Sequence, residues 1–358
     1  MQNREILLLS HITLGYGSPE ILNLYDILTK QGFQVTVSDQ EDSVRKYYNI
    51  PGIKRYFRLR IDKLSEKEKE VEYKRLLEFK KSINPFLVIS TFSPFLTDSK
   101  FPLNLGKYKI LYASEIIGNE KTNHLDAIIA PNEDRLDLIA RNSSVKKFLI
   151  YNAPLLRKKL SNDENIKNYN VLNVLYQGQI SHESGVSTLL AALRQSDNVF
   201  LHICGDIRDS DIKDDLYELQ NKGKLIYHGF LKQHELNEIR EMCHIGFIGW
   251  REDLAKNMNS IRYCCPTKLY DYISYGMPVV FLHNYTLNKW NDIYRFGFGT
   301  TSTKSSKELS VIFENLYSEK KLYQQKSRRC ISLYRSFFNY EFQARKLANY
   351  IEEELVNE

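Results

Sequence analysis

A proline-started segment late in the sequence combines residue types that could bind a phosphorylated ligand. Pro266 is expected at the first position of a helix, where its missing N–H costs nothing. The backbone amides of Thr267, Lys268 and Leu269 would then be free to face a diphosphate, because the first turn of a helix offers them no internal acceptor. Asp271 follows one turn later and could accept the hydroxyls of a ribose. A solvated helix residue is the alternative interpretation for Asp271.

Two further loops could approach the same kind of ligand. Residues 11–18 follow the first apolar run and contain Gly15 and Gly17, which allow the backbone to come close to a ligand. A plain tight turn explains this loop equally well, and His11 at its start is the histidine most expected in a cleft. Residues 178–185 place serines and glycines at a helix start, where capping alone is an alternative.

The elements that position these loops form two series of alternating strands and helices. Strands that are apolar along their whole length are typical of a parallel sheet covered on both faces. The first series is expected at 6–9, 86–91, 109–114, 126–131 and 148–154, and the second at 171–180, 198–206, 224–230, 244–250 and 277–283. The pattern predicts an α/β chain of two doubly wound domains, with ligands at the carboxyl ends of the strands.

The polar, unpatterned residues 157–170 are the predicted linker between a first domain at 1–156 and a second at 171–335. Residues 336–358 are expected to form an aromatic-rich helix that packs back toward the first domain. Two charged regions of the first domain add to this organisation. The residues of KLSEKEKEVEYKRLLEFKK are balanced in charge and predict an exposed helix. Val44 to Lys63 mixes basic and aromatic residues, which suits an anionic membrane surface or a lipid diphosphate; a basic helix and loop with buried aromatics is the alternative.

Composition narrows the functional classes. The chain has 358 residues, 42% of them hydrophobic, which is enough for two cores. A net charge of +6 suits anionic partners without requiring nucleic acid. The five cysteines show no repeated C-x-x-C spacing, so we expect neither a disulfide framework nor a zinc site, and a reducing cytoplasm fits best. No apolar run reaches transmembrane length, and the N-terminal one lacks a cleavage site.

Four segments in the second half carry a resemblance to a known family. PTKLYDYISYGMPVV resembles the P-N-K-L-x-E-Y-x-x-x-G-x-P-V-V segment of GT-B glycosyltransferases in and near glycosyltransferase family four. In the same order as in that family, LYQGQISHESGVSTLLAAL resembles the G-R-L-x-x-E-K-G segment, FLHICGD a strand ending in G-D or G-x-G, and YHGFLKQHELNEI a V-x-F-x-G loop followed by an E-L helix. The first half matches more loosely, through its glycine loop, GFQVTV and the NAP junction.

The resemblance implies a GT-B architecture, in which two Rossmann-like domains face each other across a cleft and the second holds the nucleotide. Asp271 takes the place of the glutamate that binds the donor ribose, and Lys268 with Leu269 that of the diphosphate-facing helix start. Gly229 with Phe230 takes the place of the base-contacting loop. The donor site so predicted contains Gly15, Gly17, Gln179, Gly205, Gly229, Phe230, Thr267, Lys268, Leu269 and Asp271.

Departures from the family pattern weaken two of its implications. Many members have two glutamates eight positions apart, and the earlier position here is Tyr263, so a retaining outcome is less secure. The arginine and lysine that neutralise the diphosphate fall at Gln179 and Ser184. Because charge-assisted hydrogen bonds contribute roughly 1.5–3 kcal/mol each, another cation should compensate. The candidates are Lys268 first and then Arg262 and Arg251, for which a solvated surface charge is the better interpretation.

Catalytic candidates are fewer. Glu115 follows a buried strand and could orient the acceptor hydroxyl, or act as base if the reaction inverts; capping or packing explains it equally well. His11 is the preferred cleft histidine, whereas His124 is expected at the surface. One D-x-D occurs at Asp209-Ser210-Asp211, where helix capping and solvation are simpler explanations than a metal, so no metal site is predicted.

The predicted activity is transfer of a hexose or related sugar from a UDP- or GDP-sugar to a glycan or lipid-linked acceptor, as in bacterial surface polysaccharide or glycoconjugate assembly. The nucleotide sugar is a substrate, and no tightly bound cofactor and no nucleic acid are expected. Two alternatives remain: a sugar-nucleotide epimerase or hydrolase, and a non-catalytic GT-B subunit that binds a partner transferase. The expected location is the cytoplasm, with a peripheral position at the inner face of the cell membrane as an option.

Overall fold

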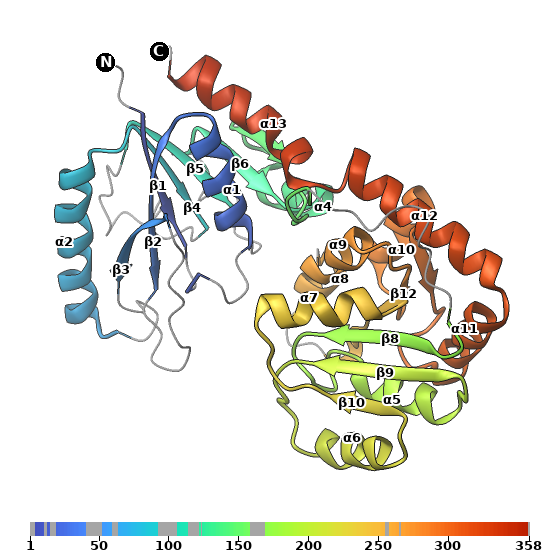
Figure 1. The fold of residues 1–358 in the computed structure, drawn as a ribbon. Helices are drawn as coiled ribbons and strands as arrows, with labels where there is room; N and C mark the ends of the chain where they lie inside the picture. The colour runs from blue at the N-terminus through green and yellow to red at the C-terminus, as the bar shows by residue number, and fades with distance from the viewer. Residues whose placement is uncertain are drawn as a thin grey trace. The chain divides into compact units, whose positions relative to one another are not determined.

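The computed structural model of this chain (Figure 1) describes residues 4–10, 13–14, 19–40, 52–58, 64–91, 106–113, 122, 124–157, 169–254, 258–264 and 266–356. The chain divides into two compact units. The first contains Met1–Leu155 together with Tyr340–Glu358, and the second contains Leu156–Asn339. Of the predicted linker, residues 158–168 lie outside the described part.

The described strands of the first unit form a seven-stranded sheet in the order β3-β2-β1-β4-β5-β6-β7, and every neighbouring pair is parallel. Parallel strands need crossover helices on both faces, which is why β1 and β4 are buried along their whole length. The strands are β1 Glu5–Leu9, β2 Gln34–Gln40, β3 Lys54–Arg58, β4 Leu87–Ser90, β5 Tyr108–Tyr112, β6 Ala127–Ala130 and β7 Lys146–Leu149.

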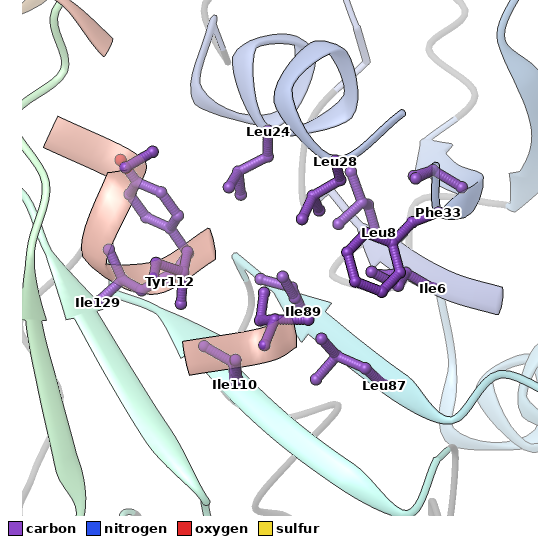
Figure 2. Packing of buried hydrophobic residues seen from close by; sticks show 14 of the residues in the cluster. Ile6, Leu8, Leu24, Leu28, Phe33, Leu87, Ile89, Ile110, Tyr112 and Ile129 are labelled. Carbon is purple, nitrogen blue, oxygen red and sulfur yellow. The ribbon is translucent and has the colours of Figure 1, made fainter. Parts of the chain in front are cut away.

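Helices cover both faces of this sheet. On one face, Leu24 and Leu28 of α1 (Pro19–Lys30) pack in one hydrophobic cluster with Ile6 and Leu8 of β1, as Figure 2 shows. On the other face, residues of α2 (Glu66–Ile83) and α4 (Glu133–Ala140) pack with Leu7 and Leu9. A capping box at Ser65 starts α2, which confirms the helix predicted there from its balanced charges.

The last helix of the chain, α13 (Tyr340–Tyr350, continued by a π-helical turn over Ile351–Leu355), belongs to the first unit. The amide of Tyr340 donates to the carbonyl of Pro154 at 3.0 Å. Glu352 pairs with Arg4 at 2.7 Å. Several apolar residues of α13 are buried in the same core as α1. Tyr340 and Tyr350 are the aromatic residues of this segment that belong to that core.

The described strands of the second unit form a six-stranded parallel sheet in the order β10-β9-β8-β11-β12-β13. Its strands are β8 Leu172–Gln177, β9 Val199–Cys204, β10 Leu225–Tyr227, β11 Ile245–Ile248, β12 Val279–Phe281 and β13 Gly297–Gly299. Its helices are α5 Val186–Arg194, α6 Ile212–Asn221, α7 Gln233–Met242, the 3₁₀ turn η3 Glu252–Leu254, α8 Met258–Arg262, α9 Thr267–Ser274, α10 Tyr285–Tyr294, α11 Ser306–Ser318 and α12 Lys320–Ser336.

Some sequence expectations were wrong in detail. The helix expected over residues 336–358 begins later, because α12 ends at Ser336 and α13 begins at Tyr340. Buried Phe338 fills the break between them. The short edge strands β3 and β13 were not predicted, since three to five residues carry too weak a pattern. Among the described helices, none is both long enough and apolar enough to cross a membrane.

Candidate functional site

Three glycines follow three neighbouring strands of the second unit at their carboxyl ends. Gly178, Gly205 and Gly229 come directly or shortly after β8, β9 and β10, and all have positive φ, at 131°, 136° and 69°. A Cβ on Gly205 would lie 1.8 Å from the carbonyl oxygen of Gly178, so only glycine fits there. The amide of Gly205 in turn donates to the carbonyl of Gly229 at 2.8 Å. This edge therefore exposes backbone to which a ligand could come close.

Helix α9 is fixed beside this edge by a buried tyrosine. The ring of Tyr272 packs where a side chain on Gly246 of β11 would otherwise sit, since a Cβ there would lie 2.1 Å from a ring carbon. The hydroxyl of Tyr272 accepts the amide of Gln177, at the end of β8, at 3.2 Å. At the other end of α9, Gly276 adopts φ 66° and the amide of Met277 reaches the carbonyl of Tyr272 at 3.0 Å, a Schellman motif. Gly276, which lies in the PTKLYDYISYGMPVV segment, thus ends α9.

The start of α9 differs in two respects from the sequence expectation. Pro266 is the N-cap, in extended conformation, and Thr267 is the first helical residue. The amide of Leu269 is not free, because it donates to the carbonyl of Pro266 at 3.0 Å in a tight first turn. The amides of Thr267 and Lys268 find no acceptor within the described part of the chain. Two amides, rather than three, are therefore available to a ligand.

Lys268 places its ammonium group among aromatic rings and backbone. Its Nζ lies 4.6 Å from the ring centroid of Tyr176 and 5.7 Å from that of Trp250. A Cβ built on Gly178 would lie 3.1 Å from the same nitrogen. The ammonium therefore lies against the sheet edge formed by Gly178, Gly205 and Gly229, which we call the glycine edge. Burial lowers the pKa of Lys268 to about 8. No carboxylate of the described residues pairs with it. A half-buried cation without a described counter-charge is well suited to an anionic ligand that can reach it.

Asp271, one turn further along α9, is held by two side chains. Its Oδ2 accepts the amide nitrogen of Gln177 at 2.8 Å and Nη2 of Arg240 at 2.7 Å. Nε of Arg240 in turn donates to Oε1 of Gln177 at 2.9 Å. The side chains of Asp271, Gln177 and Arg240 therefore form a hydrogen-bonded ring, called the clamp below. No described residue donates to Oδ1. Asp271 is therefore a clamped, partly exposed carboxylate and not the solvated helix residue of the alternative interpretation.

Other predicted residues lie at or near this edge. Gln179 is exposed, and its carbonyl accepts the hydroxyl of Tyr176. Phe230 follows Gly229 directly and keeps 55% of its surface exposed. The ammonium of Lys268 and the glycine edge thus lie together, with Phe230 at the far end of that edge. Arg240 was not predicted as a site residue. Its position next to Ile239 on the apolar face of α7 was a usable signal, because a buried arginine must be paired with an acceptor.

Two loop explanations also need correction. Ser181 and Ser184 do not cap α5; each accepts the other's amide, at 3.1 and 3.0 Å, and Gly185 is the N-cap. Asp211 occupies the N-cap of α6 but makes no capping hydrogen bond, and its Oδ2 lies 2.8 Å from Nε2 of His182. The D-x-D segment therefore interacts with the loop after β8.

The secondary cation candidates are engaged elsewhere. Arg251 forms a bidentate pair with Asp253 at 2.8 and 2.9 Å. The guanidinium of Arg262 lies 5.0 Å from the ring centroid of Tyr285. Arg262 and His124 are exposed, as expected of surface residues, whereas only 18% of the Arg251 side chain is exposed, so Arg251 is a paired and largely covered arginine rather than a solvated charge. The remaining predicted residues, His11, Gly15, Gly17 and Glu115, lie outside the described residues.

Neither a protein-family model nor a curated protein matches this sequence. Solved structures match it over nearly its whole length. HepE from Anabaena in complex with UDP is 13% identical with a TM-score of 0.73, covering 97% of this chain and 99% of that one. Sucrose-phosphate synthase from Thermosynechococcus elongatus is 12% identical at 0.70, covering 99% and 100%. The lipopolysaccharide outer core galactosyltransferase WaaB is 12% identical at 0.65, covering 98% and 99%.

These similarities, together with the two parallel sheets, confirm the predicted fold class: the chain has the GT-B architecture of two Rossmann-like α/β domains. At 12–13% identity they establish the fold alone. The activity must be argued from the site.

Proposed function

We propose that this chain is a glycosyltransferase that uses a nucleoside diphosphate sugar as donor. The observation that carries the proposal is the ammonium of Lys268, which is partly exposed, lies among aromatic rings and backbone at the start of α9, and has no described counter-charge. Beside it are the unbonded amides of Thr267 and Lys268 itself. A diphosphate would supply the missing negative charge and accept those amides.

The rest of the site suits the remaining parts of such a donor. Oδ1 of Asp271 is available to a ribose hydroxyl. Gly229 and the exposed ring of Phe230 could contact the base, since an aromatic face stacks on any base. In the transfer, the bond between the anomeric carbon and the diphosphate oxygen breaks and a bond to the acceptor oxygen forms. Lys268 and the two amides would stabilise the charge that develops on the departing diphosphate.

The finer assignments are proposals of the same kind. We favour a UDP- or GDP-sugar because matched structures of HepE contain UDP and UDP-glucose. We favour a glycan or lipid-linked acceptor, since WaaB is a lipopolysaccharide galactosyltransferase and WaaG is involved in lipopolysaccharide biosynthesis. A retaining course, in which the leaving phosphate takes the acceptor's proton, is preferred. A peripheral membrane position is a further proposal that rests on the basic and aromatic composition of Val44–Lys63, most of which lies outside the described residues. Arg55 of β3 does not contribute to it, because this arginine is buried in a pair with Asp39.

A panel of UDP-, GDP-, CMP- and dTDP-sugars, read by thermal unfolding and titration calorimetry, tests the proposal. A donor at about 100 times its dissociation constant should stabilise the protein by about 2.7 kcal/mol. Asp271→Asn should weaken the binding of that donor, whereas Asp137→Asn, which changes an exposed pair on α4, should not. No stabilisation by any member of the panel would refute the proposal.

Turnover separates the proposal from its alternatives. Incubation of the bound donor with and without candidate glycan or lipid-linked acceptors should give a transferred product that requires the acceptor. Free sugar or an epimerised donor without acceptor would indicate the epimerase or hydrolase instead. Donor binding without turnover on any acceptor would indicate the non-catalytic subunit.

A further inference from the structure

Arg240 is a buried cation in the second unit to which the proposed function has not yet assigned a role. It is 2% exposed and lies on α7, the helix that follows the loop containing Gly229 and Phe230. We propose that Arg240 is a positioning residue for nucleoside recognition. Together with Gln177, it donates to one carboxylate oxygen of Asp271 and leaves the other oxygen to accept a hydrogen bond from a single ribose hydroxyl. This inference rests on the proposed function, because it names how the same site selects its nucleotide.

The hydrogen bonds of the ring fix the orientation of every member. Gln177 presents its amide oxygen to Nε of Arg240 at 2.9 Å and its amide nitrogen to Oδ2 of Asp271 at 2.8 Å, so its side-chain amide has one allowed orientation. Nη1 of Arg240 donates to Oδ1 of Asn237 at 2.9 Å, which holds the guanidinium plane against its own helix. The guanidinium carbon also lies 5.8 Å from the ring centroid of Tyr275. The carboxylate of Asp271 is therefore held in one rotational position.

The clamp makes the two carboxylate oxygens of Asp271 different in the hydrogen bonds they accept. Oδ2 of Asp271 receives both donors, Gln177 and Arg240, while Oδ1 receives none from the described residues. An ionised carboxylate is purely an acceptor, so Oδ1 can accept a hydrogen bond from a ligand. Nη2 of Arg240 lies 2.7 Å from Oδ2 of Asp271, and both side chains are largely buried, which makes this a charge-assisted hydrogen bond. A ribose hydroxyl is the donor that this position suits.

The arrangement also couples two helices. Arg240 belongs to α7 and Asp271 to α9, and Gln177 closes the ring from the end of β8. The loop expected to contact the base leads into α7, and the carboxylate expected to contact the ribose is on α9. Arg240 thus sets the distance between the base-contacting and ribose-contacting elements.

The clamp makes a specific prediction about nucleotide choice. Because one oxygen is available, removal of one ribose hydroxyl should matter much more than removal of the other. UDP should bind wild-type protein about tenfold or more tightly than one of 2′-deoxy-UDP and 3′-deoxy-UDP, as expected for a hydrogen bond to a charged group. The other analogue should bind within about threefold of UDP. Equal losses for the two analogues would overturn the single-oxygen assignment.

Titration calorimetry with these three nucleotides on Arg240 variants tests the positioning role. Arg240→Met should bring the affinity ratio of UDP to the sensitive analogue close to one, because the carboxylate is no longer held. Arg240→Lys should restore part of the ratio. The matched control is Arg194→Met, which removes an exposed arginine paired with Asp215 and Glu218 and should leave the ratio unchanged. A loss of stability alone would not change this ratio.

The possible failures are distinguishable. A wild-type ratio retained in Arg240→Met overturns the positioning role while leaving the proposed function intact. A wild-type protein that binds none of the three nucleotides and is stabilised by no member of the nucleotide-sugar panel overturns the proposed function itself and this inference with it. If Arg240→Met does not fold, Gln177→Met removes one of the two donors and should lower the ratio partway; an unchanged ratio there also overturns the clamp.

Discussion

Replacement of Lys268 by methionine should stabilise the free protein and weaken its binding of nucleotide. Burial lowers the pKa of this lysine from its ordinary value of 10.5 to about 8. At about 1.4 kcal/mol per pH unit, this depression is equivalent to a cost of about 3 kcal/mol for carrying the charge in the folded protein at pH 7. Methionine has a similar length and packs against aromatic rings without that cost. We therefore expect Lys268→Met to be more stable than wild type by up to about 3 kcal/mol.

The pH dependence of this difference follows from the direction of the shift. Between about pH 8 and 10.5 the unfolded chain carries a proton on Lys268 that the folded protein has lost. Wild-type stability therefore rises with pH across that window, and the advantage of Lys268→Met should shrink. Urea unfolding can be followed by tryptophan fluorescence, because both tryptophans of the chain, Trp250 and Trp290, lie in the second unit. An advantage that does not change from pH 7 to 10 would refute the assignment of the cost to this ammonium.

Ligand binding should change in the opposite direction. Loss of a charge-assisted contact of about 1.5–3 kcal/mol predicts that UDP binds Lys268→Met roughly 10- to 100-fold more weakly at pH 7. Lys346→Met, on the exposed side of α13, is the control and should alter neither stability nor affinity by much. A variant that gains stability and binds UDP as well as wild type would mean that the diphosphate does not contact Lys268.

Two further predictions concern the frame of the site. Gly205→Ala should destabilise the second unit by several kcal/mol, because its Cβ would lie 1.8 Å from the carbonyl oxygen of Gly178, whereas Gly223→Ala, with φ 67° and nothing within 4 Å, should cost only about 1–2 kcal/mol in urea unfolding. Burial lowers the pKa of His202 to about 4 and also lowers that of the neighbouring His228, so the unfolded chain binds more protons below pH 6.5. Stability should fall as the pH drops from 6.5 toward 4, and His202→Phe should reduce that fall; an unchanged slope would contradict the role of His202.

The carboxyl-edge elements of the second unit could be read from local sequence. Proline before a short amphipathic stretch and glycine after it predicted the bounds of α9, since both residues act on their immediate backbone. Apolar runs predicted β8, β9, β11 and β12 for a similar reason. Gly229 and Gly205 followed from the order of motifs. The sequence also singled out Lys268 and Asp271 by their offsets along one helix.

The partners of those residues could not be read in this way. Arg240 and Gln177 are 31 and 94 positions from Asp271 in the chain, and their hydrogen bonds exist only because α7, α9 and the end of β8 pack together. Likewise, the bond from Leu269 to Pro266 depends on how tightly the first turn closes. No local pattern specifies whether a helix starts with a regular or a 3₁₀ turn.

The sequence by itself determined the alternation of strands and helices, the two-sheet α/β class and the helix on which a phosphate site would begin. These follow from hydrophobic periodicity and from backbone preferences that act over a few residues. Only the tertiary structure decided that Lys268 lacks a described counter-charge and that no described residue donates to Oδ1 of Asp271. Burial and pairing arise from groups distant in the chain, and charges acquire their pKa and their ligands only when those groups meet.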